Sequence, residues 1–161
     1  MKITFKSIGI IHTPFETPRG IPIQGALRPD IKAEVEIFSA FQPGLKDVEG
    51  FSHLILLYYF HQVKGFSLQT KPFLDTIPRG VFSIRGPRRP NPIGMTIVKN
   101  LGVKENIIKI AGVDMVNGTP LLDIKPYFPG IDSHPHVKTG WMKDKMKKKG
   151  NHTKADNRFI V

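Results

Sequence analysis

Apolar residues in this chain recur mainly in short runs with the two-residue period of β-strands. Four apolar residues between positions 31 and 37 alternate with lysine and glutamate, which predicts a strand with one face in a core and one in water. Residues 54–60 are apolar throughout, which predicts a strand buried on both faces. Further strands are predicted at residues 3–11 (an edge strand), 81–85, 93–99, 107–113 and 121–124.

Helical periodicity is scarce, and turn signals separate the apolar runs. Short helices are expected only at about residues 45–49 and 139–150. Asn117-Gly118, between two apolar runs, predicts a type I′ hairpin turn, which needs positive φ at both central residues. The pattern predicts a mainly β fold, a small closed or partly open β-barrel with few short helices. We expect the barrel domain at residues 1–137 and a basic C-terminal tail at residues 138–161.

Composition narrows the class of protein. A length of 161 residues suits one domain, and no apolar run reaches the roughly 18 residues of a membrane span. We expect no signal peptide, because the first residues interleave charged and apolar side chains. The chain has no cysteine, which excludes disulfides and thiolate metal sites. These features suit a cytoplasmic protein.

The net charge of +11 points to nucleic acid as a partner, with simple solubility as the alternative. The charge is concentrated at the C-terminus, where residues 138–161 hold eight basic and two acidic residues. We expect Trp141 and its basic neighbours either to add RNA affinity or to form a solvated tail.

The sequence Arg-Gly-Pro-Arg-Arg-Pro-Asn-Pro-Ile-Gly, at residues 85–94, is the strongest candidate for a binding loop. Its three prolines fix φ and lack N–H groups, which excludes a helix or a central strand. Arg88 and Arg89 therefore predict a fixed anion-binding wall, although a rigid basic connection is the alternative. A second proline-stiffened segment, residues 122–132, contains Tyr127, which could stack on a base or plug the barrel end.

Histidines offer further candidates. His61 and Gln62 follow the apolar run, where polar groups often border a pocket; a half-buried structural histidine is equally plausible. Asp132, His134 and His136 are the best metal-binding cluster, but three donors in a loop are weak evidence, and we expect no metal. No phosphate-binding loop or other familiar catalytic motif occurs.

Several motifs, in order, resemble the TsaA-like (TrmO) family across roughly residues 8–132. They are Phe-Ser-His-Leu at 51–54, His61-Gln62, Gly-Val-Phe-Ser-Ile-Arg at 80–85, Arg-Pro-Asn-Pro-Ile-Gly at 89–94, Asp114 with Asn-Gly-Thr-Pro at 117–120, and Asp-Ile-Lys-Pro-Tyr at 123–127 with Asp132. The resemblance implies an S-adenosylmethionine-dependent tRNA methyltransferase on a small β-barrel. Its expected acceptor is N6 of N6-threonylcarbamoyladenosine next to the anticodon. The resemblance also implies a homodimer with the cofactor near the subunit interface.

The resemblance further implies a set of site residues. The expected cofactor contacts are Gln24, Gly25, Ala26, His61, Gln62, Arg85, Met95, Asn117, Gly118, Thr119 and Pro120. The expected tRNA contacts are Arg88, Arg89, Asn91, Lys125 and Tyr127. The general base is not identified; the candidates are Asp132, Tyr127 and His61.

Two positions depart from the family pattern. Ile23 stands where members often carry arginine, and Asn117 where they often carry aspartate. We expect these changes to affect the affinity for the cofactor more than the methyl transfer itself. Two alternatives stay open: a non-catalytic RNA-binding barrel, which would not bind S-adenosylmethionine, and a methyltransferase with a different acceptor.

Overall fold

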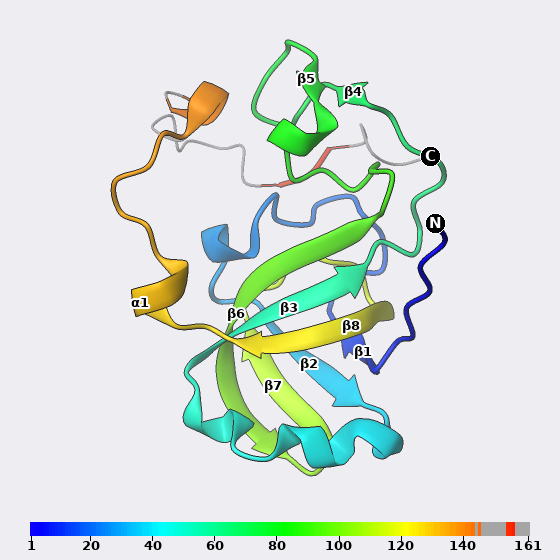
Figure 1. The fold of residues 1–161 in the computed structure, drawn as a ribbon, viewed down its shortest axis with the longest axis vertical. Coiled ribbons are helices and arrows are strands. Elements are labelled where there is room, and N and C mark those ends of the chain that lie inside the picture. The colour runs from blue at the N-terminus through cyan, green and yellow to red at the C-terminus, as the bar shows by residue number, and fades with distance from the viewer. Residues whose placement is uncertain (144, 146–153, 157–161) are drawn as a thin grey trace.

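The computed structural model describes residues 1–143, 145 and 154–156, and its centre is a closed antiparallel barrel (Figure 1). The barrel order is β1-β2-β7-β6-β3-β8. Its strands are β1 (Gly9–His12), β2 (Lys32–Ile37), β3 (His53–Tyr59), β6 (Ile93–Lys104), β7 (Ile107–Ala111) and β8 (Thr119–Pro126). A separate ribbon consists of β4 (Gln69–Thr70) and β5 (Arg79–Gly80). The predicted mainly β barrel is confirmed.

Alternating side chains of the strands fill the barrel. Val35 and Ile37 of β2 are buried, as its alternating pattern predicts. In β3, Leu54 and Leu56 are buried, but Tyr59 on the outer face is 41% exposed. The prediction that this strand is buried on both faces was therefore wrong, because the barrel covers only its inner face. The prediction of an edge strand near the N-terminus was also wrong, since β1 pairs with both β2 and β8.

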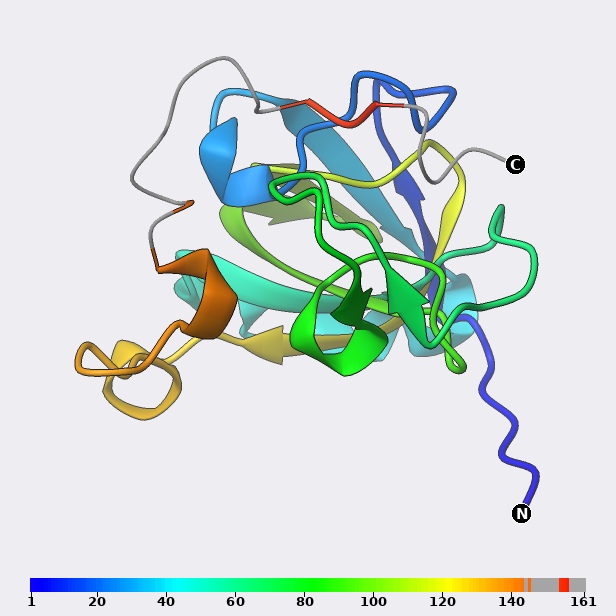
Figure 2. The same cartoon turned by 90° about the horizontal axis from the view of Figure 1, so that it is seen from above.

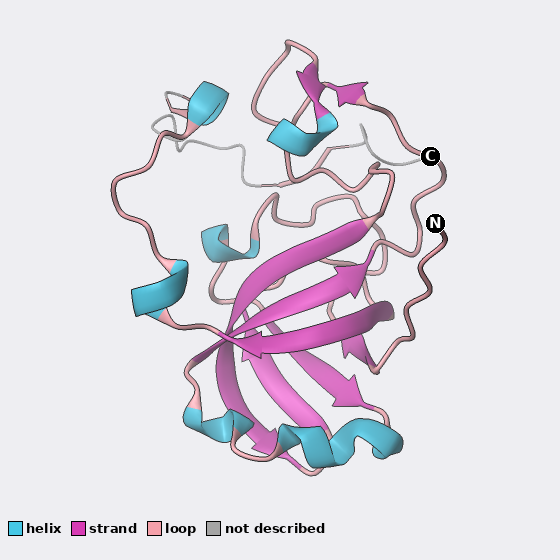
Figure 3. Ribbon diagram, viewed as in Figure 1, coloured by secondary structure: helices cyan, strands magenta, loops and turns pink. Residues whose placement is uncertain are grey.

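Short helical turns close the two ends of the barrel (Figure 3). The 3₁₀ helices η2 (Ser39–Leu45) and η3 (Val48–Gly50) lie at one end, and Asp47, with φ of 68°, separates them. The expected helix at 45–49 is thus broken by a left-handed residue. At the other end lie η1 (Gly25–Leu27), η4 (Val81–Ser83) and the β4–β5 ribbon (Figure 2).

The C-terminal part of the chain contains α1 (Pro129–Asp132) and η5 (Gly140–Met142). Of the helix expected at residues 139–150, η5 is the part that can be compared; residues 144 and 146–150 lie outside the described residues. Among the described residues, no helix has the length and apolar character to span a membrane.

The strand predicted at residues 81–85 is instead the 3₁₀ helix η4. Val81 and Ile84 are buried while the two residues between them are exposed, and this three-residue period fits a 3₁₀ turn. The apolar run was long enough for either element, and the proline-rich sequence that follows prevents it from joining the sheet.

The hairpin predicted at Asn117-Gly118 was also wrong. The flanking strands β7 and β8 are not neighbours in the barrel, and only Gly118 of the pair has positive φ, at 74°. Both amides instead donate to the N-terminal segment, Asn117 to the carbonyl of Phe15 and Gly118 to that of Ile11. The turn therefore connects two separated strands across the barrel end.

Candidate functional site

A cavity of about 870 Å³ lies at the barrel end that carries η1 and η4. Its walls come from residues 18–24, the end of β3 with the following loop, the loop after η4, the start of β6, and parts of residues 114–119 and 139–156. Figure 2 shows these segments around the barrel end. A cavity of this size can enclose a ligand of several hundred daltons.

The floor of the cavity is a buried polar cluster around Asp114. Its Oδ2 accepts a hydrogen bond from the Gly25 amide at 2.8 Å, and its Oδ1 accepts bonds from the hydroxyls of Thr96 and Tyr58. Burial raises the pKa of the Asp114 carboxyl, and burial also raises the pKa of Tyr58 well above its ordinary value. Asp114 therefore ties η1 to the barrel strands beneath the cavity.

Two close approaches of the backbone shape this floor. A Cβ at Gly94 would overlap the ring of Tyr58, and a Cβ at Gly25 would overlap the carbonyl of Gly112. Glycine at both positions lets Tyr58 and the η1 loop pack directly against the strands. The motif glycine at position 94 thus has a packing reason that is visible in the structure.

The rim of the cavity carries groups that can bind a polar ligand. Arg85 donates a hydrogen bond from Nη1 to Oε1 of Gln24 at 3.0 Å, which joins the loop after η4 to the loop before η1. His61 also lines the cavity, and partial burial lowers its pKa below the ordinary histidine value. The cavity therefore combines a guanidinium, an amide and a neutral imidazole with an apolar lining.

Residues 10–133 match the family model described as the tRNA-methyltransferase O N-terminal domain. The chain belongs to this family. The resemblance drawn from the motifs is thereby confirmed.

Relatives and solved structures agree with this membership. A probable S-adenosyl-L-methionine-binding protein of Pyrococcus abyssi is 45% identical over 99% of this chain and 86% of its own length. The Escherichia coli tRNA (adenine(37)-N6)-methyltransferase is 34% identical over 85% of this chain. The crystal structure of TrmO from Pseudomonas aeruginosa superposes with a TM-score of 0.74 at 32% identity, covering 88% of this chain. The chain spans 63% of the length of each of these last two proteins.

The TrmO-type barrel brings about half of the predicted cofactor residues to the cavity. Those that line it are Gln24, His61, Gln62, Arg85, Met95 and Thr119. Gly25 lies behind this lining, bonded to Asp114. The lining does not include Ala26, Asn117, Gly118 or Pro120. Asn117 instead accepts a hydrogen bond from the Thr13 amide and donates one to Glu16.

The predicted tRNA residues divide between two ends of the molecule. Arg89 lines the cavity, and its Nη1 donates to the carbonyl of Val81 in η4 and to those of Ile84 and Gly86 in the following loop, which gives it a bracing role. Arg88 and Asn91 belong to the same loop but do not line the cavity. Lys125, ion-paired with Asp123 at 2.7 Å, lies near the end of β8, at the other end of the barrel.

Of the three candidate bases, His61 alone lines the cavity. Tyr127 packs against His53, with ring centroids 6.4 Å apart, and its amide donates to the His53 carbonyl. Asp132 accepts a hydrogen bond from the Phe128 amide at 2.7 Å and so stabilises α1. Among the described residues, no group of three or more His, Asp or Glu side chains could hold a metal ion.

Sequence reasoning missed two groups of cavity residues. The floor residues Tyr58 and Asp114 were assigned no role; Asp114 entered only as one of the motif residues that carry the family resemblance. The second group comes from the basic C-terminal part, where no pattern indicated contact with the barrel. Its members are Thr139, Trp141, Met142, Ala155 and Asp156.

Proposed function

We propose that this protein is an S-adenosylmethionine-dependent tRNA methyltransferase that modifies N6 of adenine 37. The main support is the match to the tRNA-methyltransferase O domain over residues 10–133, which contains most of the walls of the cavity. The relatives named for this activity are longer than this chain, which spans 31% of the human protein and 63% of the Escherichia coli protein. Within that proposal, the finer acceptor is the N6-threonylcarbamoyl form of the base. With tRNA as substrate, we expect the protein to act in the cytoplasm.

The residues present fit S-adenosylmethionine. The volume of about 870 Å³ suits a nucleoside joined to an amino acid, and the mixed lining offers apolar surface for a purine. Gln24 and Arg85 would bind the polar groups of the amino acid part, and a guanidinium suits a carboxylate. When bound, the cofactor supplies a methyl group already activated by a sulfonium.

The task left to the protein is mainly alignment and exclusion of water, and orientation alone can contribute several kcal/mol. Asp114 holds the Gly25 amide and thereby the position of Gln24 at the rim. His61 is the candidate closest to this chemistry, because a neutral imidazole in the cavity can accept the proton that the acceptor nitrogen releases. Tyr127 and Asp132 stay candidates with less support, since neither lines the cavity.

The test combines cofactor binding with analysis of modified nucleosides. Purified protein should bind S-adenosylmethionine in calorimetry, and unmethylated tRNA incubated with both should gain a methylated N6-threonylcarbamoyladenosine, detected by mass spectrometry. Cofactor binding with methylation of another nucleoside would support the alternative acceptor. Absence of cofactor binding would contradict the proposal and favour a non-catalytic RNA-binding barrel.

We also propose a homodimer built on the outer face of β3 and β6. Six apolar residues lie there in cross-strand pairs, Ile55 with Ile97, Leu57 with Met95 and Tyr59 with Ile93. Four of them are exposed, and soluble monomers seldom leave such a continuous apolar face in water. Ile93 and Met95 also line the cavity, so a partner on this face would adjoin the cofactor site.

Two matched variants test the dimer. Ile97→Glu should give monomers in light scattering, because it places a charge in the apolar face. Leu101→Glu is the control: Leu101 lies on the same strand and is 42% exposed, against 40% for Ile97, but it sits at the irregular pairing of β6 with β7. A monomeric wild-type protein, or an Ile97→Glu variant that stays dimeric, would contradict this interface.

A further inference from the structure

We propose that the C-terminal segment, described at residues 139–143, 145 and 154–156, is a wall of the cofactor cavity held in place by Asp75. A tail that served only to bind RNA would follow the barrel in sequence without contributing to the cavity. The proposal rests on the proposed function, since it takes S-adenosylmethionine as the ligand. Three sets of contacts support it.

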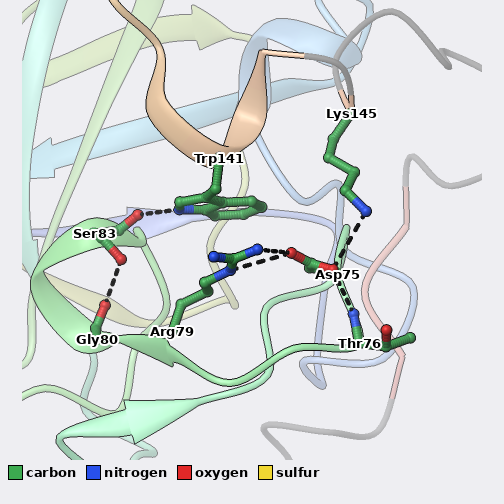
Figure 4. Close-up of polar contacts among 7 residues, drawn as sticks. All are labelled: Asp75, Thr76, Arg79, Gly80, Ser83, Trp141 and Lys145. Atoms are coloured by element: carbon green, nitrogen blue, oxygen red, sulfur yellow. Dashed lines mark hydrogen bonds and ion pairs between the residues drawn. The ribbon is translucent and has the colours of Figure 1, made fainter.

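The first set fixes Trp141, which lines the cavity. Figure 4 shows Trp141 above Arg79 and next to Ser83. Its indole Nε1 donates a hydrogen bond to the carbonyl oxygen of Ser83 at 2.9 Å, and the guanidinium carbon of Arg79 lies 5.5 Å from the ring centroid. A cation at this distance over an indole ring attracts it. Both contacts join the segment to η4 and β5, and η4 itself lines the cavity.

The second set is centred on Asp75, whose side chain is only 2% exposed. Its Oδ2 accepts hydrogen bonds from Arg79 Nη2 at 2.7 Å and Arg79 Nε at 3.2 Å, and its Oδ1 lies 3.3 Å from Lys145 Nζ. The Arg79 guanidinium holds the pKa of the Asp75 carboxyl well below its usual range. Asp75 therefore acts on the segment in two ways, directly through Lys145 and indirectly by orienting Arg79 under Trp141.

The third set joins the segment to the loop that precedes η1. The Ala155 amide donates to the Ile21 carbonyl at 2.6 Å, and the Gly20 amide donates to the Ala155 carbonyl at 3.1 Å. Lys154 and Pro22 form an isolated antiparallel bridge. This loop continues directly into Gln24, so the segment braces a predicted cofactor residue from behind.

These contacts have a functional consequence, because Thr139, Trp141, Met142, Ala155 and Asp156 all line the cavity. A segment that served RNA alone would not need to pack an indole against η4. We infer that docking of this segment completes the cofactor site before tRNA arrives. Asp75 is then a positioning residue for cofactor binding, since it does not itself line the cavity.

Two lysines on the segment allow a matched test. Lys145 pairs with Asp75, whereas the exposed side chain of Lys143 has no ion pair within the described part of the chain. Lys145→Ala and Lys143→Ala remove the same charge from the same segment, so an RNA-binding tail would respond equally to both. We expect Lys145→Ala to weaken S-adenosylmethionine binding in calorimetry about threefold and Lys143→Ala to leave it unchanged, with Lys145→Arg restoring the affinity. Trp141→Ala should weaken binding about tenfold or more.

Trp141 is the only tryptophan of the chain, so its fluorescence reports docking independently of affinity. We expect added S-adenosylmethionine to change its emission, and Lys145→Ala to shift the emission of the free protein to the red, as a more hydrated indole requires. Wild-type cofactor affinity in Trp141→Ala, or equal effects of the two lysine variants, would overturn the proposal. If the wild-type protein itself binds no S-adenosylmethionine, the proposed function fails, while the emission of Lys145→Ala still decides whether the segment docks through Asp75.

Discussion

Two proline-stiffened segments, residues 85–94 and residues 122–132, were both expected to contact tRNA, but they lie in different surroundings. Residues 85–94 border the cavity, with Arg85, Arg89 and Gly94 in its lining. Residues 122–132 contribute nothing to that lining, although they too combine prolines with a cation, Lys125, and add the aromatic Tyr127. Composition and stiffness therefore indicated two candidate binding loops, and only one of them borders the cavity.

Strand direction explains the difference. β8 begins at the cavity with Thr119 and runs antiparallel to β3, so that its last residue, Pro126, pairs with Leu54. At about 3.3 Å per residue, eight residues of strand carry the chain more than roughly 20 Å from the cavity. Residues 85–94 instead lead into the cavity end of β6, where Gly94 pairs with Tyr58. Whether a segment borders the cavity therefore depends on which end of its strand it adjoins.

The largest effect is expected from a pair of glycines, one in each segment. Gly94→Ala should lower the free energy of unfolding by about 2–3 kcal/mol, because the new methyl group overlaps the Tyr58 ring. Gly130→Ala should change it by less than about 0.5 kcal/mol, since a Cβ there meets nothing within 4 Å. Urea denaturation measures both. Equal stability of the two variants would mean that the close packing of Gly94 against the Tyr58 ring does not contribute to the stability of the fold.

The next effect concerns the cofactor and uses one cation from each segment. Arg85→Ala should weaken S-adenosylmethionine binding about tenfold, because it removes a charged donor from the cavity rim and frees Gln24. Lys125→Ala should leave the affinity unchanged, since Lys125 pairs with Asp123 outside the cavity. Titration calorimetry on both variants decides the matter. A larger loss for Lys125→Ala would assign the cofactor to the other segment.

Much of the barrel could be predicted from local patterns. The alternation at residues 31–37 follows from one buried face, and β2 forms there as expected. Strand order could not be predicted, because it depends on pairings between residues far apart in the chain. That is why Asn117-Gly118 suggested a hairpin, whereas the turn joins two strands that do not pair.

The site was predictable to a smaller extent. Family motifs indicated His61 and Arg85, which the structure brings to one cavity. They did not indicate Trp141, because it contacts Ser83 and Arg79, which precede it by about 60 residues in the sequence. No local periodicity of apolar residues can predict contacts between positions so far apart. A basic run is typical of solvated tails and of RNA-binding tails, and neither interpretation includes a wall of a pocket.

A smaller effect is expected within residues 85–94, where the two adjacent arginines differ. Arg89 braces the loop through three carbonyls, so Arg89→Ala should weaken both cofactor and tRNA binding by about threefold to tenfold. Arg88 does not line the cavity, and its buried Nε has no hydrogen-bond partner among the described residues, so we expect Arg88→Ala to weaken tRNA binding alone. Filter binding with tRNA and calorimetry with cofactor separate these effects. The opposite assignment would follow if Arg88→Ala weakened cofactor binding and Arg89→Ala did not.

The smallest effect is a pH dependence at His61, at the cavity end of β3, compared with His53 at its other end. Burial lowers the pKa of His61 in the folded protein below the ordinary value of 6.5, so the unfolded chain binds more protons than the folded one near that pH. The contribution of neutral His61 to stability is therefore complete above pH 6.5 and is lost as the pH falls through and below that value. His61→Gln should make the melting temperature fall less between pH 8 and about pH 5.5 than it does in wild type. His53 lies beside Tyr127 and outside the cavity, so His53→Gln should keep the wild-type change in melting temperature between these two pH values. A smaller change in His53→Gln than in His61→Gln would contradict the assignment to His61.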